Sequence, residues 1–401
     1  MPAYIGVNGK AKEIAKVYKG NSEGKAELIW GPKGIIKYAK GIDPLSVDRT
    51  VGGAAVTSDS ELAIFLSGVR YTNSPNYSDD TYDSYVRALD EYTSDLVHVV
   101  SEADSSKFYG EQREGIATAT VGEYTLFACG KYKDSNGDTQ ISSILEFFHY
   151  SGFQVFAPNP DNCITVPKTG MVGVTVGSHA IFAGGYKGKY AVTCDNNVIA
   201  ISDTLTISTA ASLSAEKAGL AGSLAANGKY ALFAGGKNNS SGNTGYFNGV
   251  ELYDSDLVKT QGTAISQKVR HSTACSNGDY TIVMGGCTWS PYTGFVDVYD
   301  KNMTKSSLTD VHEGNRCNYR SSSLGEYMVF GQPWDGGTKV NEIDVYDGNL
   351  THTTIPTNEN KYTASSLWVT LGKYIISAGG QDSCQNKYVN FNDVNAYYLW
   401  E

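Results

Sequence analysis

The stretch KYALFAGG, residues 229–236, decides the fold because versions of it recur along the whole chain. Six other apolar runs end in, or very near, a glycine pair in the same way. They are ELAIFLSG (61–68), EYTLFACG (123–130), SHAIFAGG (178–185), DYTIVMGG (279–286), EYMVFGQP (326–333) and KYIISAGG (373–380). Subtracting their last residue numbers gives spacings of 62, 55, 51, 50, 47 and 47 residues. A strand-built repeat of this length predicts a β-propeller, here with seven blades.

Four strands are expected in each repeat unit, as the fifth unit illustrates. VRHSTAC (269–275) and DYTIVMGG are joined around a turn at 277–278, and FVDVYD (295–300) and MTKSSLT (303–309) at 301–302. Short turns between such runs predict antiparallel hairpins. The 44 glycines and 28 tyrosines agree with an all-β chain, because glycine suits tight turns and tyrosine suits half-buried strands.

The seventh unit is one strand short. It supplies three strands, the last of them in VNAYYLWE (394–401). The stretch Gly34–Ile42, before the first unit, has the length and apolar content of the missing strand. We expect it to complete blade seven, which closes the ring between its two ends and removes two exposed sheet edges. The predicted fold is therefore a seven-bladed, kelch-like β-propeller over residues 34–401.

Residues 1–33 form a separate segment with a repeat of their own. YIGVNGKAKEI, from Tyr4, is echoed by YKGNSEGKAELIW, from Tyr18, with one residue inserted. The segment is too short and too poor in apolar residues to bury a core alone. We predict that it is β-rich and attaches to another protein.

The charge and the cysteines of the chain exclude several classes of partner. A formal net charge of −10 argues against nucleic acid and anionic membranes, because both favour clustered Lys and Arg. No run approaches the ~20 apolar residues of a membrane span, and no secretory signal is recognisable. The seven cysteines contain no CxxC pair, so neither a disulfide framework nor a zinc ribbon is indicated. We expect synthesis in a reducing cytosol.

The repeat resembles the kelch family of propellers. In that family a basic residue precedes the first strand, a glycine pair ends the second, and the third is of the type VEVYD. The echoes here are LDEY, VELYD, VDVYD and IDVYD, which end at Tyr92, Asp254, Asp300 and Asp347. The tryptophan usual in the fourth strand is absent from most units, so the chain resembles a divergent member.

The N-terminal repeat resembles short GVNGKAK and GKA.L.W elements of tail and other virion proteins of phages and prophages. That resemblance covers about 30 residues. It implies a structural protein of the virion, made in the bacterial cytoplasm of the host, that contacts other tail proteins through residues 1–33.

Strand polarity places different connections on the two faces of the propeller. The turns joining strands 1 to 2 and 3 to 4 are short and share one face, the plain face. The loops joining strands 2 to 3 are long, differ in every unit and lie on the other face, the variable face, where binding is usually carried. Aromatic rings among Asn, Ser and Asp in these loops suit sugars. The candidates are Tyr71, Tyr77, Tyr82, Tyr186, Tyr190, Tyr246, Trp289, Tyr292, Trp334 and Tyr388. The alternative is that they pack each loop onto its neighbours.

A basic residue recurs just before the first strand of each unit. These residues are Arg49, Arg113, Lys168, Lys217, Arg270, Arg316 or Arg320, and Lys361. A ring of cations at one mouth of the channel would attract acidic sugars or carboxylates. The alternative is that each cation pairs with a carboxylate or carbonyl of the adjacent blade.

No catalytic motif is recognisable. Asp134, Asn136 and Asp138 have the alternate spacing of calcium loops, but the distal glutamate is missing and a plain hairpin turn is the alternative. The six histidines form no HxxxH or HExxH pair, and no GxSxG or phosphate loop occurs. The Tyr, Cys and His ligands of kelch-like copper oxidases have no recognisable counterpart. We expect no cofactor, no metal and no enzymatic activity.

The function expected from the sequence is that of a non-enzymatic, tail-associated virion component. Residues 1–33 attach it to the particle, and the variable face binds a glycan or protein of the host surface. Two alternatives stay open, a cytosolic kelch-type interaction module and a divergent sugar-processing enzyme.

Overall fold

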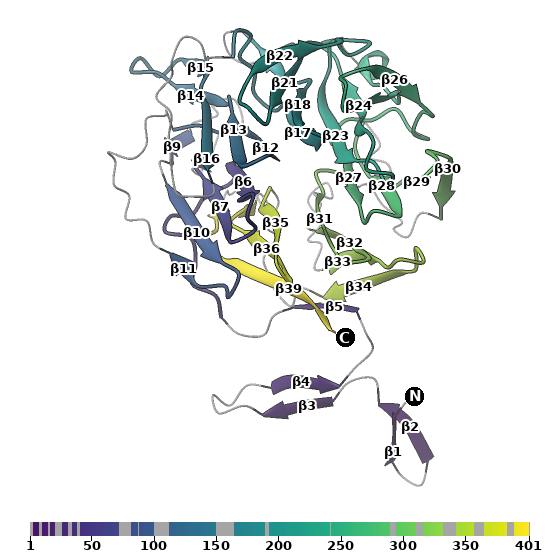
Figure 1. Ribbon diagram of the computed structural model, residues 1–401. Helices are drawn as coiled ribbons and strands as arrows, with labels where there is room; N and C mark the ends of the chain where they lie inside the picture. Colours follow the sequence, from purple (N-terminus) through teal and green to yellow (C-terminus); the bar gives the residue numbers. More distant parts are fainter. Residues whose placement is uncertain are drawn as a thin grey trace.

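The computed structural model is an all-β protein with seven small antiparallel sheets arranged as a seven-bladed β-propeller (Figure 1), which confirms the predicted fold class. It describes residues 3–7, 10–14, 17–20, 26–30, 34–37, 41–71, 82–86, 88–99, 112–149, 164–188, 192–240, 242–288, 294–309, 316–331, 342–356, 365–382 and 389–400. Within these ranges the single helix is the short 3-10 turn η3 (Gly242–Gly245).

Each blade begins with a strand at the centre of the ring. From blade one to blade seven these innermost strands are β6 (Gly53–Val56), β12 (Ala117–Val121), β17 (Val172–Val176), β23 (Ala218–Leu224), β27 (Thr273–Ser276), β31 (Arg320–Leu324) and β35 (Leu367–Leu371). Each contacts the innermost strand of the next blade, and β35 contacts β6. The ring is therefore closed.

The second and third strands carry the apolar repeats. The second strands are β7 (Leu62–Leu66), β13 (Tyr124–Ala128), β18 (His179–Ala183), β24 (Ala231–Lys237), β28 (Tyr280–Met284), β32 (Tyr327–Gly331) and β36 (Tyr374–Ala378). The third strands are β10 (Leu89–Thr93), β16 (Leu145–His149), β21 (Val198–Ser202), β25 (Val250–Tyr253), β29 (Val296–Asp300), β33 (Glu342–Tyr346) and β39 (Val394–Trp400). Strands buried on both sheet faces read as continuous apolar runs, which is why the repeats were visible in the sequence.

The fourth, outermost strands are shorter and more polar. In blades one and three to six they are β11 (His98–Val99), β22 (Ile207–Ala210), β26 (Lys259–Gly262), β30 (Lys305–Leu308) and β34 (His352–Pro356). Blade two has three strands in the described part of the chain. Before β26, β30 and β34, the side chains of Asp254, Asp300 and Asp347 accept backbone N–H bonds within the preceding turn. The aspartate at the end of VELYD, VDVYD and IDVYD thus fixes the turn to the outermost strand.

Blade seven is completed by the N-terminal strand β5 (Gly34–Lys37), which pairs antiparallel with β39 so that Trp400 faces Gly34. The sequence predicted this closure, although the strand ends at Lys37 and not at Ile42. Ile42 packs instead against the core between blades one and seven. Because β39 runs from the variable face to the plain face, β5 begins at the plain face.

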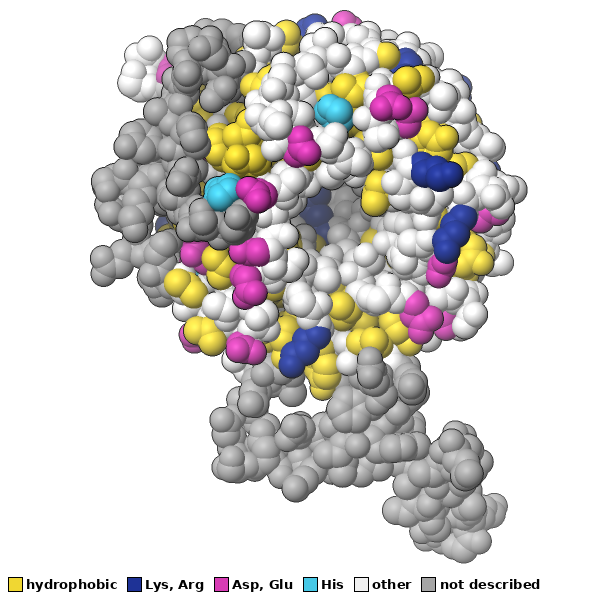
Figure 2. All heavy atoms as spheres, viewed as in Figure 1, with side chains coloured by type: hydrophobic (Ala, Val, Ile, Leu, Met, Phe, Trp, Pro, Cys, Tyr) yellow, Lys and Arg dark blue, Asp and Glu magenta, His cyan; other side chains and the backbone are white. Residues whose placement is uncertain are grey.

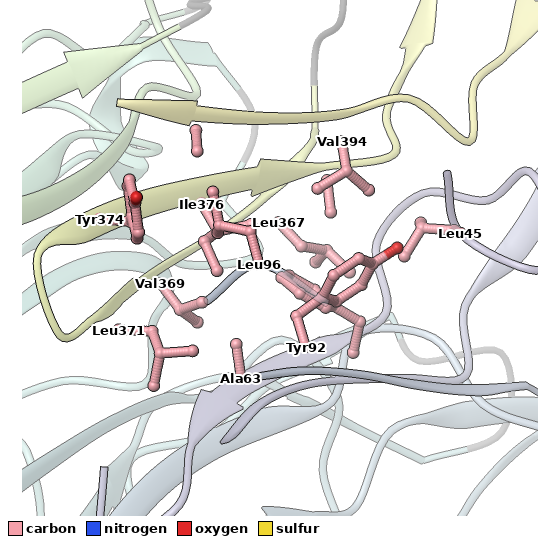
Figure 3. Packing of buried hydrophobic residues seen from close by; sticks show 13 residues of the cluster. Leu45, Ala63, Tyr92, Leu96, Leu367, Val369, Leu371, Tyr374, Ile376 and Val394 are labelled. Carbon is pink, nitrogen blue, oxygen red and sulfur yellow. The ribbon is translucent and has the colours of Figure 1, made fainter. Parts of the chain in front are cut away.

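The core lies between neighbouring blades. Figure 3 shows Tyr92 of blade one among Leu367, Ile376 and Val394 of blade seven. The Tyr92 ring packs edge-on against Phe65 at 5.8 Å, and its hydroxyl donates to the Asp43 carbonyl at 2.9 Å. Tyrosines at the equivalent position, Tyr253, Tyr299, Tyr346 and Tyr397, are also fully buried. Large apolar burial on both sides of every blade holds the ring closed.

The loops on the variable face carry small hairpins of their own. These pair β8 (Val69–Tyr71) with β9 (Tyr82–Tyr85), β14 (Lys131–Lys133) with β15 (Thr139–Ile141), β19 (Tyr186–Lys187) with β20 (Thr193–Cys194), and β37 (Gln381–Asp382) with β38 (Val389–Asn390). The loops therefore form a layer of paired strands outside the blades.

The N-terminal repeat corresponds to two hairpins that share part of their register. The strands are β1 (Ala3–Val7), β2 (Lys10–Ile14), β3 (Val17–Gly20) and β4 (Ala26–Trp30). Gly6 pairs with Ala11 in the first hairpin, and Gly20 pairs with Ala26 in the second. The pairing differs at Val17, which pairs with Trp30 across a register shift that the first hairpin lacks.

Candidate binding face and central channel

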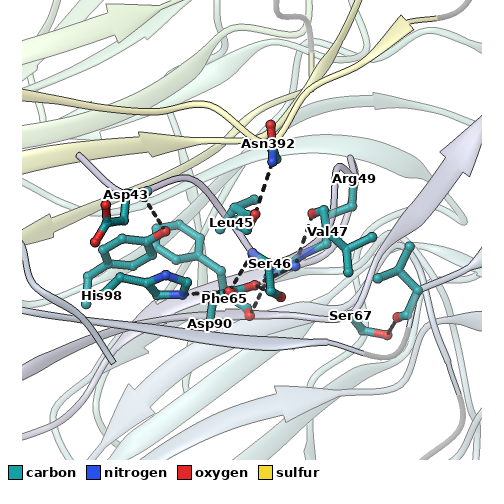
Figure 4. A network of polar contacts seen from close by, with 12 residues as sticks. Asp43, Leu45, Ser46, Val47, Arg49, Phe65, Ser67, Asp90, His98 and Asn392 are labelled. Carbon is teal, nitrogen blue, oxygen red and sulfur yellow. Dashed lines mark hydrogen bonds and ion pairs between the residues drawn. The ribbon is translucent and has the colours of Figure 1, made fainter. Parts of the chain in front are cut away.

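The basic residue before blade one is buried inside that blade. Arg49 is fully buried and contacts Asp90 of β10 at 2.6 Å, while its guanidinium also donates to the Phe65 carbonyl at 2.9 Å (Figure 4). Asp90 accepts further bonds from the Ser46 N–H at 2.8 Å and from His98 at 2.7 Å. Burial alone would raise the pKa of Asp90, but Arg49 and Ser46 hold it below its ordinary value.

The same arrangement recurs in the next three blades. The pairs are Arg113 with Glu146, Lys168 with Asp195 (3.4 Å), and Lys217 with Glu251 (2.6 Å). All four cations, Arg49 included, are at most 1 % exposed. Their partners belong to the same blade and not to the adjacent one. Because these cations are sealed within their blades, a ligand at the channel mouth would not reach them, which favours the structural alternative.

A hydroxyl residue three places before the cation accompanies this pair, and our sequence analysis missed it. In LSVDR (45–49) and LSAEK (213–217), the serine gives both its N–H and its hydroxyl to the carboxylate. The pattern of an aliphatic residue, Ser or Thr, two further residues and a cation also occurs in ITVPK (164–168). That spacing is the signal that identifies the buried network.

Blade five departs from the pattern by one residue. In ISQKVR (265–270), Val269 occupies the place of the cation, since it faces Gly286 as Arg49 faces Gly68. Arg270 instead pairs with Cys287, as Thr50 pairs with Val69 in blade one. Arg270 is thus not a member of the predicted ring, because it stands one position after the place of the cation, and successive side chains of an extended chain point to opposite sides.

Arg270 lies among side chains of three blades. It hydrogen-bonds the Tyr186 hydroxyl and the Cys287 thiol and lies close to Tyr246. The pKa of Cys287 is lowered to about 7, mainly by a hydrogen bond from Cys317. Burial opposes this shift, and the charge of Arg270 adds to it. Tyr186 and Tyr246 are the two predicted aromatics whose side chains are described, and the structure brings them together on the variable face. Tyr246 is 3 % exposed, with Lys237 5.3 Å above its ring.

Blade six resolves the choice between its two arginines. Arg316 contacts Glu342 at 3.0 Å and Asp344 at 3.8 Å, as the buried cations of the other blades do. Arg320 lies four residues further on, at the start of β31, among the residues that line the channel. Lys361 lies outside the described residues.

The other candidates are only partly covered by the structure. Tyr71 and Tyr82 are described in backbone only, in β8 and β9. Tyr77, Tyr190, Trp289, Tyr292, Trp334 and Tyr388 lie outside the described residues. Asp134 accepts the N–H groups of Asn136 and Asp138 at 2.9 and 3.0 Å, as expected for a hairpin turn. In the described ranges, no three His, Cys, Asp or Glu side chains come close enough together to hold a metal ion.

A collar of residues with left-handed backbone surrounds the channel where the innermost strands begin. The φ angles are 48° at Val51, 65° at Gly115, 66° at Gly170, 69° at Gly219, 56° at His271, 57° at Asn318 and 60° at Ser365. Collar residues bond across blades: the N–H of Gly115 donates to the Val51 carbonyl at 2.9 Å, and that of Asn318 to the His271 carbonyl at 3.0 Å. The four non-glycine members of the collar are Val51, His271, Asn318 and Ser365. A left-handed backbone is unfavourable for such residues, so placing them here costs conformational energy.

The collar lines a cavity of about 460 Å³. Figure 2 shows the hollow at the centre of the ring, with basic side-chain atoms visible in its depth. Blades one to four contribute mainly glycine and aliphatic residues to the lining, together with Thr118 and Tyr186. Blades five to seven contribute His271, Asn318, Arg320, Ser321, Ser365 and Ser366, together with Leu367 and Trp368. Most of the polar side chains in this lining therefore come from blades five to seven.

Comparison with known proteins identifies no relative of this chain. No protein-family profile matches the chain, and no curated protein is similar to it. Within the described ranges, the chain has no helix that is both long and apolar enough to cross a membrane.

Proposed function

We propose that this chain is a non-enzymatic component of a phage virion. In this proposal, a tail-associated propeller is attached through residues 1–33 and presents its variable face to a glycan or protein of the host surface. The observation that carries the proposal is the position of β5. Gly34 begins that strand at the plain face, opposite the long loops, so an attached N-terminus would leave the variable face free.

The two resemblances seen in the sequence support this role. The kelch-like strands VELYD, VDVYD and IDVYD suit a binding scaffold, and the N-terminal GKA repeat is similar to elements of virion proteins. Its duplication as two similar hairpins fits a segment copied for attachment.

The chemistry of the channel favours binding over catalysis. A glycoside hydrolase needs two carboxyl groups flanking the bond that breaks. Among the described residues, the lining of the channel includes no Asp or Glu. The sugar-processing alternative therefore gains no support from this cavity, while a cytosolic interaction module would use the same variable face.

The test compares the full chain with a chain that lacks residues 1–33. The proposal predicts that both bind host cells or a glycan array, and that only the full chain enters virions when supplied during infection. Structural phage genes beside the coding sequence would agree, whereas metabolic neighbours would favour the cytosolic module. If the full chain enters virions but binds no host surface, the role is architectural.

A further inference from the structure

The guanidinium of Arg320 has no counter-charge. Its side chain makes no ion pair or hydrogen bond with any described residue, and its Nε is buried without a partner. Burial lowers the pKa of Arg320, and no nearby carboxylate offsets that effect. Arg49, Arg113 and Arg316 each have a carboxylate partner, whereas Arg320 has none among the described residues. Arg270 also lacks a carboxylate, but it lies beside the Cys287 thiol and two tyrosines.

The described residues that line the cavity around Arg320 include no Asp or Glu. His271, from the neighbouring blade, lines the same cavity, and its pKa is lowered to about 3 by burial and by Arg270 and Arg320. It is therefore neutral at pH 7, and an imidazole in that state can donate one hydrogen bond. Asn318, Ser321, Ser365 and Ser366 are further polar residues of this part of the lining.

The opposite side of the cavity is mostly apolar. It is formed by Val51, Ile116, Met171, Val172 and Leu220 of blades one to four, with Thr118 and Tyr186 as its polar members. A volume of about 460 Å³ lies within the range of small-molecule sites, which is roughly 300–1,000 Å³. The cavity thus suits a small molecule with an anionic end and a less polar body.

Arg320 is only partly exposed, and its Nε is buried without a partner. A charge that loses part of its hydration and gains no partner is costly. The planar fork of arginine matches the two oxygens of a carboxylate. We propose that the central channel binds the carboxylate of a small organic acid on Arg320, with the rest of the ligand against the apolar side. This site would serve a virion protein and an interaction module equally, so it does not rest on the function proposed above.

The first experiment is calorimetric titration of the full-length protein with glucuronate, benzoate and acetate. Glucose and inorganic phosphate are the matched controls for the sugar ring and for charge. We expect at least one of the three carboxylates to bind at least about tenfold more tightly than glucose and phosphate. That factor corresponds to one hydrogen bond between charged groups, which the two controls would not form with Arg320 in the same way. Binding of phosphate alone, or of none of the three carboxylates, would overturn the proposal.

The second experiment uses Arg320→Met, with Arg70→Met as its control. Arg70 is 46 % exposed and pairs with Asp48 at 2.8 Å on the variable face. We expect Arg320→Met to weaken carboxylate binding at least about tenfold and to leave the unliganded melting temperature unchanged or raised, because an uncompensated charge is removed. Arg70→Met should bind as the parent does.

A structural role for Arg320 gives the opposite pattern. Arg320→Met would then melt at a lower temperature and, if it folds, would bind carboxylates like the parent protein, and this outcome would refute the proposal. Arg320→Lys keeps the charge and loses the fork, so it serves if the methionine variant does not fold. It should bind about tenfold more weakly than the parent, and parent-like binding by this variant would also count against the site.

Discussion

The carboxylate of Glu251 joins three segments of blade four. It accepts the Ser214 N–H and hydroxyl at 2.9 Å each, and it contacts Lys217 at 2.6 Å and Lys259 at 3.4 Å. Lys217 is 1 % exposed, whereas Lys259 is partly open to solvent. The contact with Lys217 is therefore the more deeply buried of the two. Without Lys217, the negative charge of the buried Glu251 would be balanced only by Lys259.

We predict that Lys217→Met lowers the free energy of unfolding by about 3 kcal/mol, the lower end of the range for breaking a buried pair. The matched control is Lys301→Met, since Lys301 contacts Asp279 at 2.5 Å while both side chains are about 60 % exposed. That change should cost less than about 1 kcal/mol. Urea denaturation of both variants checks the difference, and equal midpoints would contradict it.

Stability should also fall in acid because of the buried carboxylates. Burial alone would raise the pKa values of Asp90, Asp195 and Glu251, but cations and hydrogen bonds hold all three below their ordinary values. A carboxyl group whose folded pKa is depressed stabilises fully above its unfolded pKa of about 4, and this contribution is lost as pH falls through the folded pKa.

Urea midpoints measured from pH 7 down to pH 3 should therefore be steady at first and should drop below about pH 4.5. Glu251→Gln removes one titrating group, so its acid decline should be shallower than that of the parent. A midpoint that stays constant down to pH 3 would show that these groups titrate alike in the folded and unfolded chains.

The element that most affects closure of the ring is β5. Its Ile35 is 6 % exposed and packs with Ile375 and Tyr397 of blade seven and with Val345 of blade six. We predict that Ile35→Ala costs about 2–4 kcal/mol, as for other truncations of buried aliphatic side chains. Val258→Ala, at a residue 55 % exposed, should cost less than about 0.5 kcal/mol.

Thermal melting with size-exclusion chromatography checks this prediction. A loosened β5 would expose the edge of β39, and exposed edges associate, so the Ile35→Ala variant should also form oligomers on heating. If Ile35→Ala and Val258→Ala melt at the same temperature, closure by β5 contributes little to stability.

The elements themselves could be predicted from the sequence, because burial on both faces of a blade makes the second and third strands apolar throughout. KYALFAGG and VELYD each correspond to a strand at nearly the predicted residues. The site could be predicted only in part. A recurring cation shows in the sequence, but Lys217 is buried while Arg270 is not in the equivalent place. Arg270 stands one position later than the other cations, which is clear only once Val269 is seen to face Gly286.

The charge state of the channel is the other feature that the sequence conceals. Arg316 and Arg320 are equally basic in the sequence, and either could complete the predicted ring. Only the fold shows that Arg316 reaches Asp344 while Arg320, on the innermost strand, reaches no described partner. Which charges are compensated depends on contacts between segments far apart in the chain, and no local pattern encodes them.

In the whole molecule, the alternating direction of successive strands places the short turns on the plain face and the long loops on the variable face. Blade four shows this within one unit: β23 ends at the plain face, the turn at 225–230 returns the chain, and β24 ends at the variable face. Gly228 in that turn and Ser240 beyond β24 are both exposed. The two positions are only 12 residues apart by subtraction, yet they lie on opposite faces.

This pair allows a test of the proposed orientation that keeps the chain otherwise intact. We predict that a bulky folded tag inserted at Ser240 blocks binding to host cells, because it covers the variable face, while the same tag at Gly228 leaves binding within about twofold of the parent. Exposed turns tolerate such insertions, and matching melting temperatures would confirm that both variants fold. Binding of labelled protein to cells measures the effect. If the tag at Gly228 blocks binding and the tag at Ser240 does not, the plain face contacts the host and the assignment of the two faces is reversed.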